Sequence, residues 1–264
     1  MSLIEILSGY RKAFFNWPLV VADLVLKKQY ITVKPRFLTN GRTLRFRVAI
    51  NHNRGGMLFE VFGFEPYKFL ATNCDLLVDI GANIADSSIY FALNGAQRVV
   101  AIEPFPVAYT MAKENITMNG LSDKIELYRV GYGYDSQMIL GDQTSSPSSQ
   151  TIPSNSGVLT EMWSLEKILK DKRGNKIFLK MDCEGCEYNL IHEPDDNLRL
   201  FDKIQIEYHF GSEKIINKLK QAGFTVTMDI HERKPGDLNL KNKVDIGYIY
   251  AENLKASLID VNLK

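Results

Sequence analysis

The sequence has few of the features that mark specialised protein classes. Three cysteines in 264 residues are too few for a disulfide scaffold and one short of a four-cysteine zinc site. Neither sign of charge is in excess, because 32 Lys+Arg stand against 31 Asp+Glu, so bulk charge attracts neither nucleic acid nor an anionic membrane. A hydrophobic content of 45% and a charged content of 24% exclude a disordered or fibrous chain. We therefore expect a globular protein with free thiols and no nucleic-acid partner.

Long apolar runs are also missing. The N-terminus lacks the basic, apolar and small-residue order of a secretory signal. The apolar stretch 17–26 is interrupted by Pro18 and Asp23 and falls short of the ~20 residues of a membrane span. With the free thiols, these absences predict a cytoplasmic protein. The stretch is either a short packing helix or an interfacial segment that touches a membrane or a partner. The second interpretation rests on the surrounding aromatic and basic residues, namely Tyr10, Arg11, Lys12, Phe14, Phe15, Trp17, Lys27 and Lys28.

The length allows one large domain or two small ones. Residues 1–73 have a mixed character that predicts an N-terminal cap. There we expect a helical opening, an antiparallel pair formed by 30–33 and 42–50, and a helical stretch from 57 towards Pro66. Residues 74–254 are expected to form a single α/β domain, and 255–264 a C-terminal tail.

Residues 74–254 alternate between strand-like and helical segments, which is the pattern of an α/β fold with a mostly parallel sheet. Continuous apolar runs such as 76–80 are typical of parallel strands that are buried on both faces. No helix separates the last two strands, so they are expected to pair antiparallel within a seven-stranded sheet. The expected strands are 76–80, 98–102, 125–130, 177–181, 203–208, 224–230 and 244–251, and the expected helices are 87–93, 106–119, 164–172 and 213–222.

One segment breaks this alternation. Residues 141–157 are rich in serine, contain Pro147 and Pro153, and have little apolar surface to bury. Such a segment does not offset its ordering entropy, so we expect a mobile loop. It is either a passive surface insertion or a lid over the active site.

The first strand–helix junction predicts a ligand site, because ligands of open α/β sheets bind at the carboxyl ends of the strands. Gly81 permits a tight turn, and free N–H groups at the following helix start can bind a carboxylate. The junction has no G-x-G-x-x-G phosphate cradle, and Asp79 beside it would repel phosphate. Glu103, 24 positions after Asp79, stands near the offset of an acid that binds ribose hydroxyls. These residues favour a nucleoside with a positive or zwitterionic tail, such as S-adenosylmethionine, over NAD.

Three sequence blocks in the α/β region resemble a known family. They are Val78-Asp79-Ile80-Gly81-Ala82-Asn83-Ile84, Val100-Ala101-Ile102-Glu103-Pro104 and Lys180-Met181-Asp182-Cys183-Glu184-Gly185-Cys186-Glu187. In this order and spacing they resemble the FkbM family of S-adenosylmethionine-dependent methyltransferases, and the similarity covers residues 75–251.

The resemblance implies a class I methyltransferase fold, which is Rossmann-like, with helices on both faces of a sheet of strand order 3-2-1-4-5-7-6. It also implies O-methylation, often of hydroxyls on sugars or natural products. By their matching positions, Asp79, Gly81 and Asn83 are expected to hold the methionine end of the cofactor and Glu103 its ribose. Ser87 adds a helix-start contact, and Gly131 lies where the adenine edge is expected. One departure is Ala85, which replaces the family's second glycine and is expected to narrow the turn.

The fourth strand of the α/β region ends in a group of acids, Asp182, Glu184 and Glu187. Methyl transfer needs an aligned acceptor oxygen and help with the loss of its proton. Asp182 is the candidate that orients or deprotonates the acceptor, and Lys180 shares its strand face and can pair with it. Alternatively, Asp182 and Glu184 merely cap the following turn and helix.

The fifth strand ends at His209, which can act as a base, bind the substrate or be structural. Glu207 alternates onto the same face. Asp182, Glu184, Glu207 and His209 could together hold a divalent ion, but their spacing is not diagnostic, and we assign no metal. Cys183 and Cys186 form a C-x-x-C pattern, yet Glu184 between them disfavours a thiolate, so we interpret both as packing residues.

Taken together, the sequence predicts an S-adenosylmethionine-dependent O-methyltransferase that acts on a hydroxyl of a sugar, a glycan or another small natural product. The alternatives are a nucleotide-dependent oxidoreductase, which the missing glycine pattern disfavours, and an inactive methyltransferase-like binding module. Acceptor recognition is expected to come from residues 1–73 and the loop 141–157.

Overall fold

A computed structural model describes residues 3–38, 40–48, 56–134, 137–139, 158–231 and 246–253. The serine-rich segment 141–157, whose role as a lid or a passive insertion was left open, lies outside the described residues. The predicted tail 255–264 also lies outside them.

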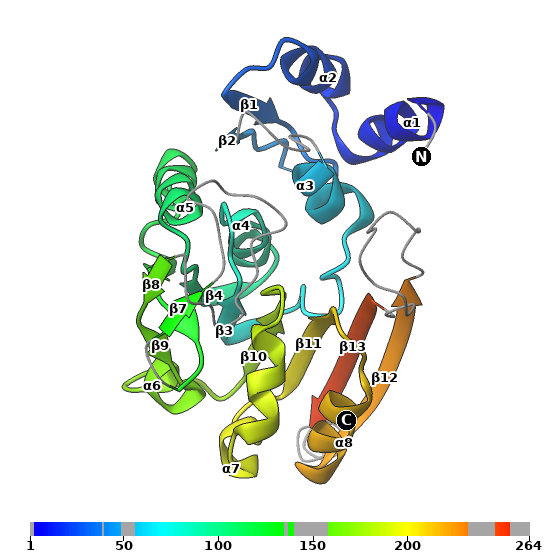
Figure 1. The fold of residues 1–264 in the computed structure, drawn as a ribbon. Helices are drawn as coiled ribbons and strands as arrows, with labels where there is room; N and C mark the ends of the chain where they lie inside the picture. The colour runs from blue at the N-terminus through cyan, green and yellow to red at the C-terminus, as the bar shows by residue number, and fades with distance from the viewer. Residues whose placement is uncertain are drawn as a thin grey trace.

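A seven-stranded sheet forms the centre of the molecule (Figure 1). Its strands, in spatial order, are β5 (Ile125–Tyr128), β4 (Ala96–Ile102), β3 (Cys74–Ile80), β10 (Ile177–Met181), β11 (Lys203–Tyr208), β13 (Ile246–Asn253) and β12 (Phe224–His231). β13 runs antiparallel to both of its neighbours, and the other pairings are parallel. The predicted α/β class, the order 3-2-1-4-5-7-6 and the single reversed strand are therefore confirmed.

Helices cover both faces of this sheet. α4 (Asp86–Leu93) and α5 (Pro106–Met118) contribute to one apolar cluster. α6 (Leu165–Leu169), the 3-10 helix η2 (Cys186–His192), α7 (Asp195–Leu198) and α8 (Glu213–Gln221) contribute to the cluster on the opposite face. Ser164 caps α6 as predicted, since its Oγ accepts a hydrogen bond from the N–H of Lys167. The helix ends at Leu169, three residues before its predicted end.

Two short pairings were not predicted. β6 (Gly131–Tyr132) lies parallel to β9 (Met162–Trp163), and β7 (Gln137–Ile139) lies antiparallel to β8 (Val158–Thr160). Strands of two or three residues leave no detectable alternation in a sequence, which explains why the pattern missed them. The two pairs bring together the parts of the chain that precede and follow residues 141–157.

The N-terminal cap comprises α1 (Leu3–Ala13), α2 (Trp17–Val25), β1 (Tyr30–Val33), β2 (Leu44–Arg47), α3 (Gly56–Phe59) and the π-helix η1 (Glu60–Phe64). The predicted antiparallel pair is confirmed by β1 and β2, although the second strand is shorter than expected. The ring of Phe46 in β2 packs against that of Phe62 in η1 in a tilted arrangement, with 5.5 Å between the ring centroids. One apolar cluster joins the cap to α4, α5 and the covered face of the sheet, so the cap packs on that face (Figure 1).

Asn115 of α5 fixes the cap to the α/β region. This side chain is fully buried. Its Oδ1 accepts from the N–H of Arg47 at 2.6 Å, and its Nδ2 donates to the carbonyls of Arg47 and Ile84 at 3.2 and 2.9 Å. One amide therefore satisfies three backbone groups, two on β2 and one in the turn before α4.

We expect Asn115→Ala to lower the free energy of unfolding by about 3 kcal/mol, because it leaves these three backbone groups without a partner in a dry environment. Urea denaturation measures the change. Thr117→Ala, an exposed position on the same helix, is the control and is expected to change stability by about 0.5 kcal/mol or less. Equal losses in the two variants would contradict this role.

Candidate active site

The turn between β3 and α4 is built from unusual backbone conformations. Gly81, Asn83 and Ala85 all have positive φ, at 80°, 47° and 64°. A Cβ on Gly81 would collide with the backbone carbonyl of Asp182. Glycine is therefore required there, and the turn is in direct contact with the end of β10. Ala85 adopts the left-handed conformation that a glycine would take, and its methyl group is fully buried.

Glu103 follows β4 and points back to this turn. Its Oε2 accepts from the N–H of Asn83 at 2.8 Å, and its Oε1 accepts from the N–H of Phe105 at 2.9 Å. Burial raises the pKa of Glu103 to about 7, against the opposing effect of these two N–H groups. Each carboxyl oxygen keeps a further lone pair for a hydroxyl donor. The arrangement suits the ribose role that the sequence predicts for Glu103.

Asn83 supplies a second feature that fits the cofactor. Its Oδ1 is buried and has no hydrogen-bond partner within the described part of the chain. A buried acceptor without a partner costs free energy, so a donor from a ligand would relieve it. The ammonium group of a zwitterionic tail is such a donor. The residues of the turn therefore fit the methionine end of S-adenosylmethionine.

Asp79 was expected to contact the methionine end of the cofactor directly, but its carboxylate is engaged by other residues of the protein. Its side chain is fully buried, and its Oδ2 accepts from the hydroxyls of Ser87 and Ser88 at 2.7 and 2.6 Å. Its Oδ1 forms an ion pair with Lys180 Nζ at 3.0 Å. The Asp79 carboxylate and the Ser87 hydroxyl are thus engaged inside the protein. They shape the turn and the start of α4.

Lys180 of β10 is the cation at the centre of the site, with 1% of its surface exposed. Besides Asp79, it donates to the carbonyl of Gly81 at 2.9 Å and lies 4.0 Å from Asp182 Oδ2. Burial opposes its charge, but the charges of Asp79 and Asp182 raise its pKa above the ordinary value. The predicted pairing of Lys180 with Asp182 is present, although Asp79 is the nearer partner.

Asp182 lies at the carboxyl end of β10, within a lateral row of polar side chains. The registers place Met181 opposite Ile206 and Glu207 opposite Tyr248, so Asp182, Glu207 and Tyr248 are neighbours across three strands. Burial and the charge of Asp182 hold the pKa of Glu207 well above its usual range, and the two carboxyl groups share a hydrogen bond. Glu207 therefore binds a proton more readily than an exposed glutamate does.

Two residues of the cap, Tyr67 and Glu60, complete the row. We call Glu60, Tyr67, Asp182, Glu207 and Tyr248 together the acid row. The Tyr67 hydroxyl donates to Asp182 Oδ2 at 3.0 Å, and its ring lies 5.4 Å from Lys180 Nζ. Glu60 of η1 lies near the same acids: partial burial of its carboxyl group and the charges of Asp182 and Asp86 raise its pKa to about 7, although the residue as a whole is exposed. Neither residue was predicted from the sequence as part of the site. They lie more than a hundred positions from Asp182 in the chain, and no local pattern marks them.

His209, just after β11, belongs to a second polar group beside this row. Its Nδ1 lies 3.0 Å from Glu187 Oε1, and its Nε2 lies 3.5 Å from Glu184 Oε2. Burial lowers the pKa of His209, but the hydrogen bond and charge of Glu187, with the charges of Asp182 and Glu184, raise it to about 9. His209 is therefore a cation at neutral pH.

Cys183 and Cys186 are buried in the apolar cluster to which α6 and α8 contribute, as expected of packing residues, but the expectation that they are free thiols was wrong. Cys183 and Cys186 form a disulfide, with their Cα atoms 5.5 Å apart. The acidic neighbour argued against a reactive thiolate, but it does not prevent oxidation of two sulfurs that a tight turn brings together. Cys74 is a free thiol. The cytoplasmic location was expected from three free thiols, and one of the three is present.

The remaining predicted positions are peripheral to the acids. Gly131 begins β6, after β5, and a Cβ there would press on Met162.

Within the described ranges, no three His, Cys, Asp or Glu side chains are grouped so that they could hold a metal ion.

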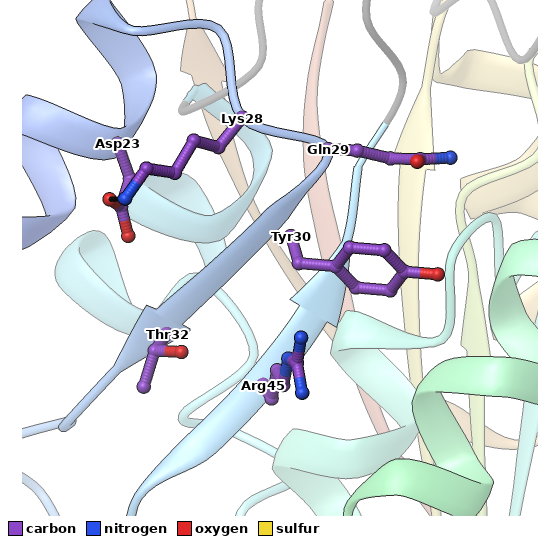
Figure 2. A pocket seen from close by; sticks show the side chains of 6 residues that line it. All are labelled: Asp23, Lys28, Gln29, Tyr30, Thr32 and Arg45. Carbon is purple, nitrogen blue, oxygen red and sulfur yellow. Dashed lines mark ion pairs between the residues drawn. The ribbon is translucent and has the colours of Figure 1, made fainter.

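A hollow with a volume of about 510 Å³ lies elsewhere, in the cap (Figure 2). Its lining comes from α2, β1, β2 and the connection between α2 and β1. The lining residues are Asp23, Lys28, Gln29, Tyr30, Thr32 and Arg45. None of them belongs to the turn or to the acid row, so the hollow is separate from the candidate active site.

Several solved structures are similar to this chain. The precorrin-6y C5,15-methyltransferase of Geobacter metallireducens GS-15 is 15% identical, with a TM-score of 0.44 over 79% of this chain and 95% of that one. TYW2 of M. jannaschii in complex with AdoMet is 16% identical, with a TM-score of 0.47 over 86% and 88%. A putative rRNA methylase of Clostridium thermocellum is 13% identical, with a TM-score of 0.44 over 72% and 94%.

A family model supplies the identification. The model of the methyltransferase FkbM domain matches residues 79–226, from the Asp79 turn through the acid row and into β12. This match spans more than half of the chain, begins within the first of the three blocks on which the resemblance rested, and includes the other two. The protein belongs to the FkbM family of S-adenosylmethionine-dependent methyltransferases.

Proposed function

We propose that this methyltransferase acts on a hydroxyl group of a sugar, a glycan or another small natural product. The observation that carries the proposal is the contact between Gly81 and the backbone of Asp182. It places the cofactor turn beside the acid row, so a methyl donor and an acceptor hydroxyl would meet at the carboxyl ends of β3 and β10.

S-adenosylmethionine supplies an electrophilic methyl group when it is bound. Glu103 would hold the ribose hydroxyls, Asn83 Oδ1 would accept from the ammonium group, and the Gly81 turn would let the backbone approach the tail. Gly131 would border the adenine. Asp79 and Ser87 act through the turn that they shape, so both are positioning residues.

Asp182 is the residue that orients the acceptor hydroxyl and takes its proton at a carboxylate oxygen. Tyr67 and Lys180 stabilise its charge. Burial raises the pKa of Glu207 and so favours its neutral form, and the pKa of about 9 favours the cation of His209 at neutral pH, so neither is a ready base there. Lys180 and His209 instead balance the negative charge of the acids, and Glu184 orients His209.

The character of the row also bears on the acceptor. Carboxyl and phenol groups from Glu60, Tyr67, Asp182, Glu207 and Tyr248 gather on one face of the sheet. Such groups bind neutral polyhydroxylated molecules through many hydrogen bonds and repel phosphates. This supports a sugar-like acceptor and disfavours a nucleic acid.

We expect Glu103→Gln to weaken binding of S-adenosylhomocysteine about 10- to 100-fold, because an amide replaces the two carboxyl oxygens that accept from the ribose hydroxyls. Isothermal titration measures the affinity. Glu126→Gln on the neighbouring strand β5 is the control and should bind as the unmodified protein does. Unchanged affinity in Glu103→Gln would remove Glu103 from the cofactor site.

We expect Asp182→Asn to keep S-adenosylhomocysteine binding and to lower kcat by about 10²- to 10⁴-fold, the usual contribution of a general base. The assay follows transfer of a labelled methyl group, after a screen of neutral glycosides has identified an acceptor. Glu207→Gln, which imitates the protonated carboxyl, should retain most of the activity. Asp196→Asn, on the exposed surface, should be neutral.

Two results would count against this proposal. Normal turnover in Asp182→Asn would exclude Asp182 as the base. Labelling of amines or RNA with no labelling of any hydroxyl would exclude the proposed acceptor class while leaving the methyltransferase assignment intact.

The charge of His209 predicts a pH dependence of stability. Its folded pKa of about 9 lies above the ordinary value of 6.5, so its stabilising contribution is complete below pH 6.5 and is lost as the pH rises through 9. At full strength it amounts to about 3 kcal/mol. The difference in unfolding free energy between the unmodified protein and His209→Gln should shrink over this window. The exposed His192→Gln is the control, and a pH-independent difference would contradict the assignment.

A further inference from the structure

The outward face of α2 is entirely apolar. Pro18, Leu19, Ala22, Val25 and Leu26 are exposed, and their spacing of one, four, seven and eight places them on one side of a helix. Leu19 is 50% exposed, Val25 73% and Leu26 67%. Phe15, in the turn that leads into the helix, is 51% exposed. Four large apolar side chains thus face away from the protein together.

The opposite face holds the helix firmly in the cap. Val20 is 1% exposed, and Trp17, Val21 and Leu24 pack against the apolar cluster. Because packing fixes this inner face, the outer face is held outward. α2 is the helix at the top of Figure 1, at the far end of the cap from α7.

Positive charge surrounds the apolar face. Residues 7–38 contain six Lys and Arg and a single acid, Asp23. Asp23 is buried and is paired with Lys28 at 2.6 Å. Arg11, Lys12 and Lys27 are exposed, and the Arg36 guanidinium lies 4.4 Å from the centre of the Phe15 ring.

The residues that line the hollow beside α2 also carry an excess of positive charge. Lys28 and Arg45 line it, and its one acid is Asp23, which already pairs with Lys28 (Figure 2). The end of the cap therefore combines an exposed apolar helix face with a surplus of cations.

We propose that α2 and its neighbouring cations dock on the surface of a lipid bilayer with anionic headgroups. Apolar side chains that enter the acyl boundary, with Lys and Arg at headgroup level, are the physical pattern of an interfacial helix. Within the described residues no helix is long and apolar enough to cross a membrane. α2 has nine residues, so its contact with the bilayer is shallow and reversible.

Charge argues against another copy of this chain as the occupant. Two such faces would bring their cations together without acids to compensate them, which opposes association. An anionic lipid surface offers the complementary charge. The proposal is independent of the proposed methyl transfer, because no residue of the acid row or the cofactor turn takes part in it.

Co-sedimentation tests the proposal, using vesicles of phosphatidylcholine alone and vesicles of equal parts phosphatidylcholine and phosphatidylglycerol. The full chain should pellet with the anionic vesicles at low salt, and high salt should release it. The double variant Val25→Asn and Leu26→Asn should bind at least about tenfold more weakly, because two exposed anchors are lost. Arg11→Gln with Lys12→Gln should reduce binding to the anionic vesicles and lessen its salt dependence.

Leu200→Asn is the control, since Leu200 is an exposed leucine outside the cap. It should bind the anionic vesicles as the unmodified protein does. All variants should keep their affinity for S-adenosylhomocysteine, which shows that they fold and separates this test from the catalytic one.

Failure of the unmodified chain to pellet with anionic vesicles would overturn the proposal, as would equal binding by the Val25/Leu26 double variant. A dimer in light scattering that this double variant converts to a monomer, without vesicle binding, would assign the face to a second copy of the chain instead.

Discussion

The ion pair between Lys180 and Asp79 is the interaction on which the active site depends. Two charges are held in the middle of the sheet, where desolvation is expensive unless every charged atom has a partner. Asp79 meets this requirement with two serine hydroxyls, and Lys180 with the Gly81 carbonyl and the more distant Asp182. The pair ties β3, β10 and the start of α4 to one point. Through Lys180 it also holds the turn between β3 and α4 next to Asp182.

The cap is a component of this site and not merely a cover for the sheet. Tyr67 hydrogen-bonds to Asp182, and Gln205 Nε2 of β11 donates to the carbonyl of Pro66 at 2.9 Å. The segment that follows η1 therefore closes over the polar row. A methyltransferase domain without this segment would expose the acids to water, where their mutual effects on pKa would be weak. The cap supplies the low-dielectric environment that raises the pKa of Glu207.

Sequence patterns predicted the parts of this structure that local chemistry controls. The apolar runs revealed the central strands, and the positions of Glu103 and Asp182 followed from their places at strand ends. The contact of Tyr67 with Asp182 joins residues far apart in the chain, and periodicity carries no information about such a contact. The disulfide was missed for another reason. The acidity of Glu184 bears on thiolate reactivity, whereas pairing depends on the turn geometry that brings Cys183 and Cys186 together.

The charges of the site limit what the acid row can bind. Lys180 is neutralised by Asp79, and His209 is shared between Glu187 and Glu184, so neither cation is free to receive an anionic acceptor. The surplus groups are carboxyl and phenol oxygens, some of which hold protons because burial raises their pKa values. Such a surface both donates and accepts hydrogen bonds without net positive charge. A neutral molecule with several hydroxyls, the proposed acceptor, would match such a surface, and a phosphate-bearing molecule would be repelled by the charged acids.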